Sequence, residues 1–311
     1  MAWKPIIVAV DDSPEAASAA ALGWRLAAAA GATCHLVHVV HDPGTAFATL
    51  AMKGRSGELE PALRELVGPR LRAALGGSVP PEVLDRLAIR VGRTAVMLNI
   101  EAERLGAGLV IVGGKHHAVV GRWLGGSTAR DAVRVVSVPV LVTAGAPGAL
   151  RRVLVAVDLS HAAKPTIAAA ERFVTLAGGA MRAIHVLQPL PFGPEAAPFL
   201  EQQRFNDDSV AALEQDVWPL LRFPGTERAV RPGDPAVELA ADATEWRADL
   251  LVVGSHGKGW VDRALLGTVT ERLLNQLPVS LLVVPVRKPE IADEAAQEPG
   301  SRERYAVPLV T

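Results

Sequence analysis

The chain has 311 residues, of which 50% are hydrophobic and 4% aromatic, so we expect two domains with aliphatic, alanine-rich cores. Its 32 basic and 33 acidic residues give a net charge of −1, which does not support nucleic acid or a membrane surface as a partner. A single cysteine, Cys34, excludes an intrachain disulfide. We expect a cytoplasmic location, because the sequence has no apolar run of about 18 residues and no leader before the first apolar segment.

The chain contains an internal repeat. The segment 6–13, which reads IIVAVDDS, recurs at 153–160 as VLVAVDLS, with Asp158 placed 147 residues after Asp11. Three later glycines recur at an offset of 141, so the second copy is six residues shorter between its second and third strands. The predicted units are residues 1–145 and 150–287, followed by a solvated, mobile tail at 288–311.

Each copy reads as alternating strands and helices. In the first copy, strands are predicted at 5–10, 33–40, 86–91, 109–112 and 138–142, and helices from Pro14, at 58–75, at 94–105 and from Ser127. In the second, strands are predicted at 151–157, 180–187, 226–231, 250–253 and 280–284. Residues 41–60 and 188–208 read as Gly/Pro-containing loops. This alternation predicts an α/β fold with a parallel sheet, helices on both faces, and ligands at the carboxyl ends of the strands.

A glycine-rich stretch follows the strand at 250–253 and leads into a helix. Gly254 and Gly257 are separated by two residues, nine more separate Gly257 from Gly267, and Thr268 comes next. Glycines allow close backbone approach, and free N–H groups at a helix start favour an anion. The stretch therefore predicts a phosphate site, although it is neither a Walker A loop nor a Rossmann fingerprint.

The G-x2-G-x9-G-[S/T] spacing resembles the nucleotide-binding signature of the universal stress protein family. The VAVD-x-S starts and the final PVSLLVVP segment extend this resemblance over both copies. It implies two tandem five-stranded domains of strand order 3-2-1-4-5, similar to adenine nucleotide alpha hydrolases. It also implies binding of ATP or another adenine nucleotide, with Mg²⁺ as an accompanying ion, pairing of domains through their fifth strands, a homodimer, and a role in stress response.

The resemblance carries a set of contact residues to the second copy. In the loop and the following helix these are Gly254, Ser255, His256, Gly257, Lys258, Gly267, Thr268, Val269 and Thr270, which would hold the phosphates. Asp158 would face the ribose or adenine, and the backbone of Val186 would meet the adenine edge. The matching residues of the first copy are Asp11, Val39, Gly113, Gly126 and Ser127. There His116 replaces the second glycine and Ala129 replaces Thr270, so we expect weak or absent binding in the first copy.

Other interpretations stay open from the sequence alone. Asp11 and Asp158 are also placed to cap the first helix of each copy, and His38 and His185 read as packed, hydrogen-bonded residues rather than ligands. No metal-ligand cluster, carboxylate pair or nucleophile–base pair is visible near the loop, which counts against catalysis. A nucleotide-binding module is therefore the favoured function, a slow ATPase is the alternative, and a nucleotide-free interaction scaffold is the third possibility.

Overall fold

The computed structural model describes residues 4–41, 44, 59–117, 122–124, 127–190, 198–255 and 266–286. Its strands are β1 (Ile6–Ala9), β2 (Cys34–Val40), β3 (Ala88–Val91), β4 (Leu109–Gly113), β5 (Lys115–His117), β6 (Arg122–Leu124), β7 (Val140–Thr143), β8 (Arg152–Ala156), β9 (Ala180–Leu187), β10 (Glu227–Pro232), β11 (Leu250–Gly254) and β12 (Ser280–Val284). Its α-helices are α1 (Pro14–Ala30), α3 (Leu59–Leu75), α4 (Pro81–Leu84), α5 (Thr94–Leu105), α6 (Ser127–Val135), α7 (Ala163–Ala177), α8 (Pro198–Ala212), α9 (Pro235–Glu245) and α10 (Thr268–Gln276).

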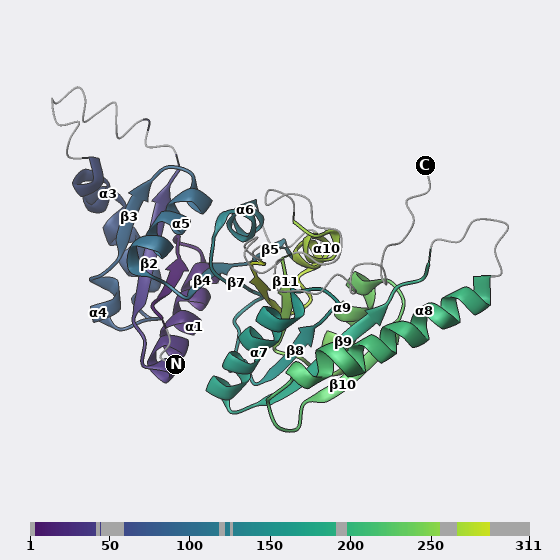
Figure 1. Cartoon of the computed structure of the whole chain (residues 1–311). Helices are drawn as coiled ribbons and strands as arrows, with labels where there is room; N and C mark the ends of the chain where they lie inside the picture. The colour runs from purple at the N-terminus through teal and green to yellow at the C-terminus, as the bar shows by residue number, and fades with distance from the viewer. Residues whose placement is uncertain are drawn as a thin grey trace, which may run out of the picture.

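Ten strands form one sheet in the order β10-β9-β8-β11-β12-β7-β4-β1-β2-β3. Within each half of the chain the five strands are parallel and follow the order 3-2-1-4-5, which confirms the predicted fold. Figure 1 shows the two halves side by side, with the N-terminal half in purple and blue and the C-terminal half in teal to yellow.

The two halves join through their fifth strands. β7 and β12 run antiparallel, with Leu141 beside Leu282, so the predicted pairing of domains occurs inside one chain. Each of these strands also has its own domain's fourth strand on the other side. Neither fifth strand therefore has an edge left for a second copy of the chain, and a homodimer, which stays a prediction, would need another surface.

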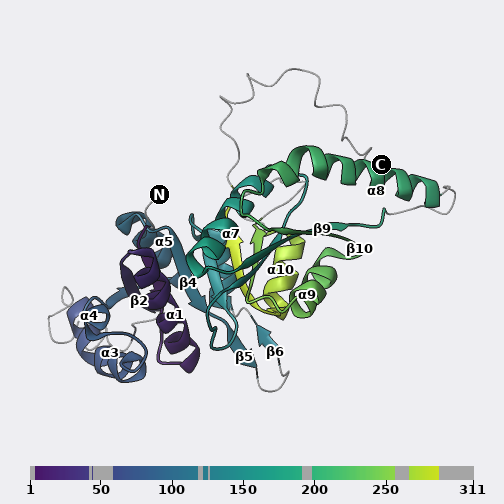
Figure 2. The same ribbon diagram turned by 90° about the horizontal axis from the view of Figure 1, so that it is seen from below.

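Hydrophobic layers cover both faces of the sheet and run across both halves. On one face α1 and α7 pack against inward-facing residues such as Val8 and Val155. On the other, α5, α6, α9 and α10 pack against residues such as Ile7 and Leu154. Gly23 lets α1 come close to the sheet, because a Cβ there would lie 2.4 Å from Cγ2 of Val8. This double layer, seen from a second direction in Figure 2, confirms the expected helices on both faces.

Two parts of the fold differ from the sequence-based expectation. Residues 188–208 were predicted as a loop, but α8 begins at Pro198 and continues through a π turn at Leu213–Val217. Proline at the first helical position and the Leu, Glu and Gln residues that follow explain this helix. In the first domain, part of the expected glycine loop forms a short antiparallel hairpin, β5–β6, in which His116 lies opposite Trp123. Predictions for residues 42–43, 45–58 and 288–311 fall outside the described residues.

Candidate functional site

The candidate site of the second domain lies where the strand order reverses. After β8 the chain builds β9 and β10 on one side and then crosses to β11 on the other side of β8. The carboxyl ends of β8 and β11 therefore lie next to each other, with Val155 beside Val252. In open α/β sheets in general, the loops that leave such a point in opposite directions form the crevice where ligands bind, and we use the word crevice for this place between the ends of β8 and β11. Asp158 follows β8, Gly254 ends β11, and Thr268 begins the next helix, so the fold brings these predicted residues to one edge.

Ser255 closes the loop that leaves β11. Its N–H donates to the carbonyl of Val284 at 2.8 Å, and its own carbonyl accepts from the N–H of Gly267 at 2.9 Å. Its hydroxyl oxygen accepts from the N–H of Val286 at 3.0 Å, and the residue is only 5% exposed. The sequence suggested that Ser255 binds nucleotide, whereas the structure shows a residue that fixes both ends of the loop. His256, Gly257 and Lys258 lie outside the described residues.

The start of α10 has hydrogen-bond donors that no described residue uses. Gly267 is the N-cap, no side chain of the described residues caps the helix, and the first helical bond runs from the N–H of Glu271 to the carbonyl of Gly267. The amides of Thr268, Val269 and Thr270 belong to the first turn, which has no partner inside the helix. Thr268 is exposed and Val269 is partly exposed. These donors, together with the positive end of the helix dipole, favour an anion at this point.

Thr270 has a different role from the one expected. It is 4% exposed, and its hydroxyl donates to the carbonyl of Gly254 at 2.9 Å. The hydroxyl thus ties α10 to the end of β11. The side chain faces the protein interior and not the crevice. Ala129, at the matching place in the first domain, is 1% exposed. The Thr-to-Ala difference between the domains therefore removes a tie within the protein, and the expectation that it removes a phosphate ligand is corrected.

The aspartates after the first strand of each domain make the same local contacts. Oδ1 of Asp158 accepts from the N–H and hydroxyl of Ser160, at 3.1 and 2.6 Å. Oδ1 of Asp11 accepts from the N–H of Ser13 at 3.0 Å and from its hydroxyl. Among the described residues, neither Oδ2 atom has a hydrogen-bond partner. One carboxylate oxygen is therefore structural, and the second remains available to a ligand.

The second strand of each domain turns backbone groups toward the crevice. In β9, Ile184 accepts from Val157 on the β8 side, whereas Leu187 accepts from Gly233 on the β10 side. Because backbone groups alternate along a strand, those of Val186 point to the β8 side, beyond the last paired residue of β8. In β2 the same alternation applies to Val39, since Val37 accepts from Val10 and Val40 accepts from Gly92. Both positions fit the predicted contact with the edge of a base.

The histidines next to these positions are structural. Nδ1 of His185 donates to the carbonyl of Val157, and Nδ1 of His38 donates to the carbonyl of Val10, each at 2.8 Å. His185 is 9% exposed. The prediction of packed, hydrogen-bonded histidines is confirmed.

The corresponding edge of the first domain keeps only part of the pattern. Gly113 ends β4 and lies close to α1, since a Cβ there would be 3.3 Å from the backbone of Glu15. Ser127 is exposed at the start of α6, while Gly126 lies outside the described residues. His116, at the place of the second glycine, is part of β5. Arg130 stands where the second domain has Glu271, so the first turns of the two helices differ in charge.

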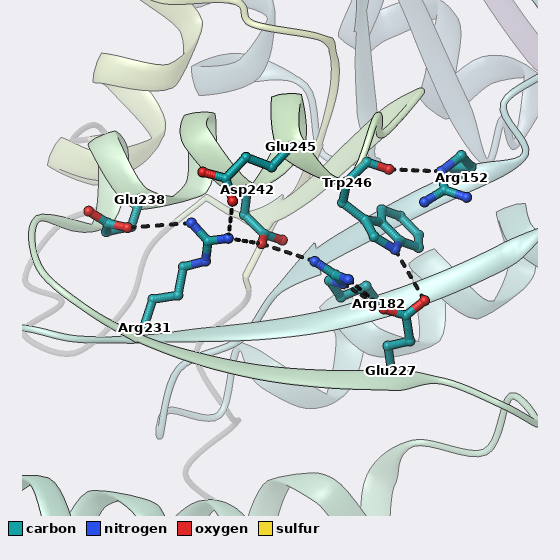
Figure 3. Close-up of polar contacts among 8 residues, drawn as sticks. All are labelled: Arg152, Arg182, Glu227, Arg231, Glu238, Asp242, Glu245 and Trp246. Atoms are coloured by element: carbon teal, nitrogen blue, oxygen red, sulfur yellow. Dashed lines mark hydrogen bonds and ion pairs between the residues drawn. The ribbon is translucent and has the colours of Figure 1, made fainter.

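A cluster of charged side chains, which the sequence analysis missed, lies on the outer part of the second domain (Figure 3). Asp242 on α9 is fully buried, and its Oδ1 pairs with Arg182 at 3.1 Å and Arg231 at 2.8 Å. Its Oδ2 has no partner among the described residues. Trp246 packs beneath two arginines, Arg152 and Arg182, with centroid distances of 4.3 and 5.1 Å.

The first domain has a related cluster. Glu101 on α5 is 2% exposed and bonds Arg90 at 2.6 Å and Arg104 at 2.7 Å. Burial alone would raise the pKa of Glu101, but the hydrogen bonds from the two arginines outweigh it and hold that pKa below its ordinary value. In both domains an arginine of the third strand and a buried acid on the next helix are 11 residues apart, which is the signal that could have found them. These clusters attach an edge strand to a helix.

The profile of the universal stress protein family matches residues 2–144 and 149–285. The chain belongs to the universal stress protein family. Because both halves match, it is a tandem-domain member.

Known universal stress proteins resemble this chain, some over nearly its whole length and others over one half of it. One from Mycolicibacterium smegmatis is 27% identical over 296 residues, which cover 91% of this chain and 97% of that protein. One from Thermus aquaticus is 25% identical over 134 residues, covering 43% of this chain and 98% of its own. The crystal structure of a universal stress protein from Archaeoglobus fulgidus has a TM-score of 0.59 at 18% identity and covers 90% of this chain and 98% of that one. The structural match supports the fold.

No described helix has the length and apolar character needed to cross a bilayer. Over the same residues, no group of His, Cys, Asp or Glu side chains is arranged to hold a metal ion.

Proposed function

We propose that this protein is a stress-response module whose second domain binds ATP or another adenine nucleotide. The observation that carries the proposal is the N-terminus of α10, which no described side chain caps and which is tied to the end of β11, the strand next to β8 at the reversal point of the sheet. On this proposal, the conformation or partner choice of the protein follows nucleotide occupancy.

The geometry supports a separate role for each group around the crevice. The amides of Thr268 and Val269 and the Thr268 hydroxyl hold the phosphates, because they are exposed donors at a helix start. The backbone of Val186 meets the edge of the base, and the free Oδ2 of Asp158 meets a ribose hydroxyl or a Mg²⁺ ion that accompanies the phosphates. Gly254 and Gly267 form the two ends of the loop that the Ser255 carbonyl closes.

The first domain is proposed to bind nucleotide weakly or not at all. Asp11, Val39 and Ser127 keep the placement of their second-domain counterparts. His116, however, stands where a glycine allows close approach, and it belongs to a paired strand. This is the observation that favours an interaction scaffold as the role of the first domain.

Calorimetric titration with ATP and Mg²⁺ tests the proposal, together with mass spectrometry of any ligand released from the purified protein. We expect about one strong site per chain. Gly257→His should abolish it, since a Cβ and an imidazole would fill space needed by a phosphate. Asp158→Ala should weaken it by about tenfold through loss of one charged contact.

The repeat supplies a matched control. Asp11→Ala removes the same side chain and the same contacts with the serine two residues on from the first domain, and it should leave the strong site unchanged. Equal affinity and stoichiometry in wild type, Gly257→His and Asp158→Ala would reject the assignment. A phosphate-release assay on the same samples measures whether bound ATP turns over.

A further inference from the structure

We propose that Arg134 of the first domain is a positioning residue of the nucleotide site in the second domain. It acts by neutralising Glu271, which stands in the first turn of the helix proposed to hold the phosphates. This inference rests on the proposed function and adds a contribution from the first domain to that site.

The contact joins two helices from different domains. Nη2 of Arg134, near the end of α6, lies 3.0 Å from Oε1 of Glu271 on α10. Both side chains are 38% exposed, so the pair is accessible to solvent and its strength depends on salt. The N–H of Glu271 makes the first helical bond of α10, to Gly267, which places this residue one turn from the exposed amides.

A carboxylate in this turn has opposite effects on the empty and the occupied site. In the absence of a ligand, a negative charge near the start of a helix stabilises it through the helix dipole. A polyphosphate bound at the same place meets a like charge, which opposes binding. The guanidinium of Arg134 cancels most of that repulsion, so the second domain binds phosphate better when the first domain is docked beside it.

Further contacts hold α10 against the first domain. β6 of the hairpin contacts α10. At the other end of the helix, Leu277 is 1% exposed and has a positive φ of 37°, which is unusual for a residue with a branched side chain. It packs against Gly114, where a Cβ would lie 2.6 Å from Cδ2 of Leu277. The helix is therefore seated on the first domain along its length, which keeps Arg134 opposite Glu271.

The arrangement works in one direction. Measured from the start of each helix, the first-domain counterpart of Glu271 is Arg130, and the second-domain counterpart of Arg134 is Asn275. The first turn of α6 thus contains no carboxylate at this position, and the arginine that α10 does carry, Arg272, pairs with Asp234 of the second domain at 2.6 Å. The domain with the altered loop supports the domain with the intact one.

The test compares ATP with adenosine, which lacks phosphate, in full-length variants. Arg134→Ala should raise the dissociation constant for ATP by about two- to fivefold at low salt, the range expected for one partly screened charge near a polyphosphate. It should leave the dissociation constant for adenosine unchanged, and the effect should shrink in high salt. Glu271→Gln should tighten ATP binding, and the double variant should behave like Glu271→Gln alone.

Arg72→Ala is the matched control, because it removes the same charge from another exposed ion pair, with Asp85 at 3.1 Å, on the first domain. Arg134→Ala that behaves like Arg72→Ala, or that weakens ATP and adenosine equally, would overturn the inference while the proposed function stands. If the wild-type protein binds no ATP, the proposed function fails and this inference fails with it.

Discussion

Replacing Thr270 with valine separates a structural from a ligand-binding role at the centre of the proposed site. Thr270 is 4% exposed and its hydroxyl donates to the Gly254 carbonyl at 2.9 Å. Valine keeps the shape, removes this bond and leaves the carbonyl without its side-chain partner. A loss of about 1–2 kcal/mol in the free energy of unfolding is expected for such a change. This corresponds to a decrease of about 2–4 °C in Tm for each kcal/mol in a domain of this size.

Substitutions of the two neighbouring threonines should have opposite effects: one lowers stability and keeps ATP affinity, and the other lowers ATP affinity and keeps stability. Thr270→Val should leave the dissociation constant within about twofold of wild type, because a buried hydroxyl makes no contact with a ligand in the crevice. Thr268→Ala should raise it by about tenfold at unchanged Tm, since an exposed hydroxyl would lose a charge-assisted bond to phosphate. Scanning calorimetry and ATP titration of the same samples measure both quantities.

Thr166→Val serves as a control, because Thr166 is 1% exposed and its hydroxyl also donates to a backbone carbonyl, that of Ala162 at 2.7 Å. It should lower Tm without any effect on ATP. If Thr270→Val raises the dissociation constant for ATP by more than tenfold while Tm stays at the wild-type value, the assignment of Thr270 to the protein interior is wrong.

Three further predictions concern stability and reactivity. Ser255→Ala should cost about 1–3 kcal/mol in unfolding free energy, because the buried N–H of Val286 loses its acceptor, and a denaturant titration that finds no change would contradict the role given to Ser255. Two arginines hold the pKa of Glu101 below its ordinary value, so this carboxylate stabilises the fold at pH values above its pKa in the unfolded chain. The contribution should disappear as the pH falls through the folded-state pKa. Glu101→Gln should therefore flatten the acid limb of a Tm-versus-pH profile, and an unchanged limb would contradict this role of Glu101. Burial raises the pKa of Cys34 to about 12, so the thiol of the native protein should not react with a thiol reagent at pH 8. The unfolded protein should consume one equivalent of the reagent, because Cys34 is the single cysteine.

The sequence predicted the strands well, because two signals agreed. Each buried strand is a short apolar run, and the same run recurs in the second copy with the same landmarks. The placement of Asp158 and Val186 at the reversal point follows from strand order alone, so it could be predicted once the family resemblance supplied that order.

What could not be predicted depends on contacts that no local pattern encodes. The direction in which Thr270 points is set by the packing of α10 on β11, and its neighbour Thr268 has the same side chain but lies exposed. The pair Arg134–Glu271 joins residues 137 positions apart, across a domain interface. The hairpin that includes His116 is also poorly encoded, because short strands in a glycine-containing segment look like a loop.

The central claim is that the exposed amides at the start of α10 hold a polyphosphate. A crystal structure of the full-length protein with a non-hydrolysable ATP analogue tests it most directly. The account predicts phosphate oxygens within hydrogen-bond distance of the amides of Thr268 and Val269, with the base against the backbone of Val186. A nucleotide bound elsewhere, or a helix start filled by side chains of the protein itself, would contradict it.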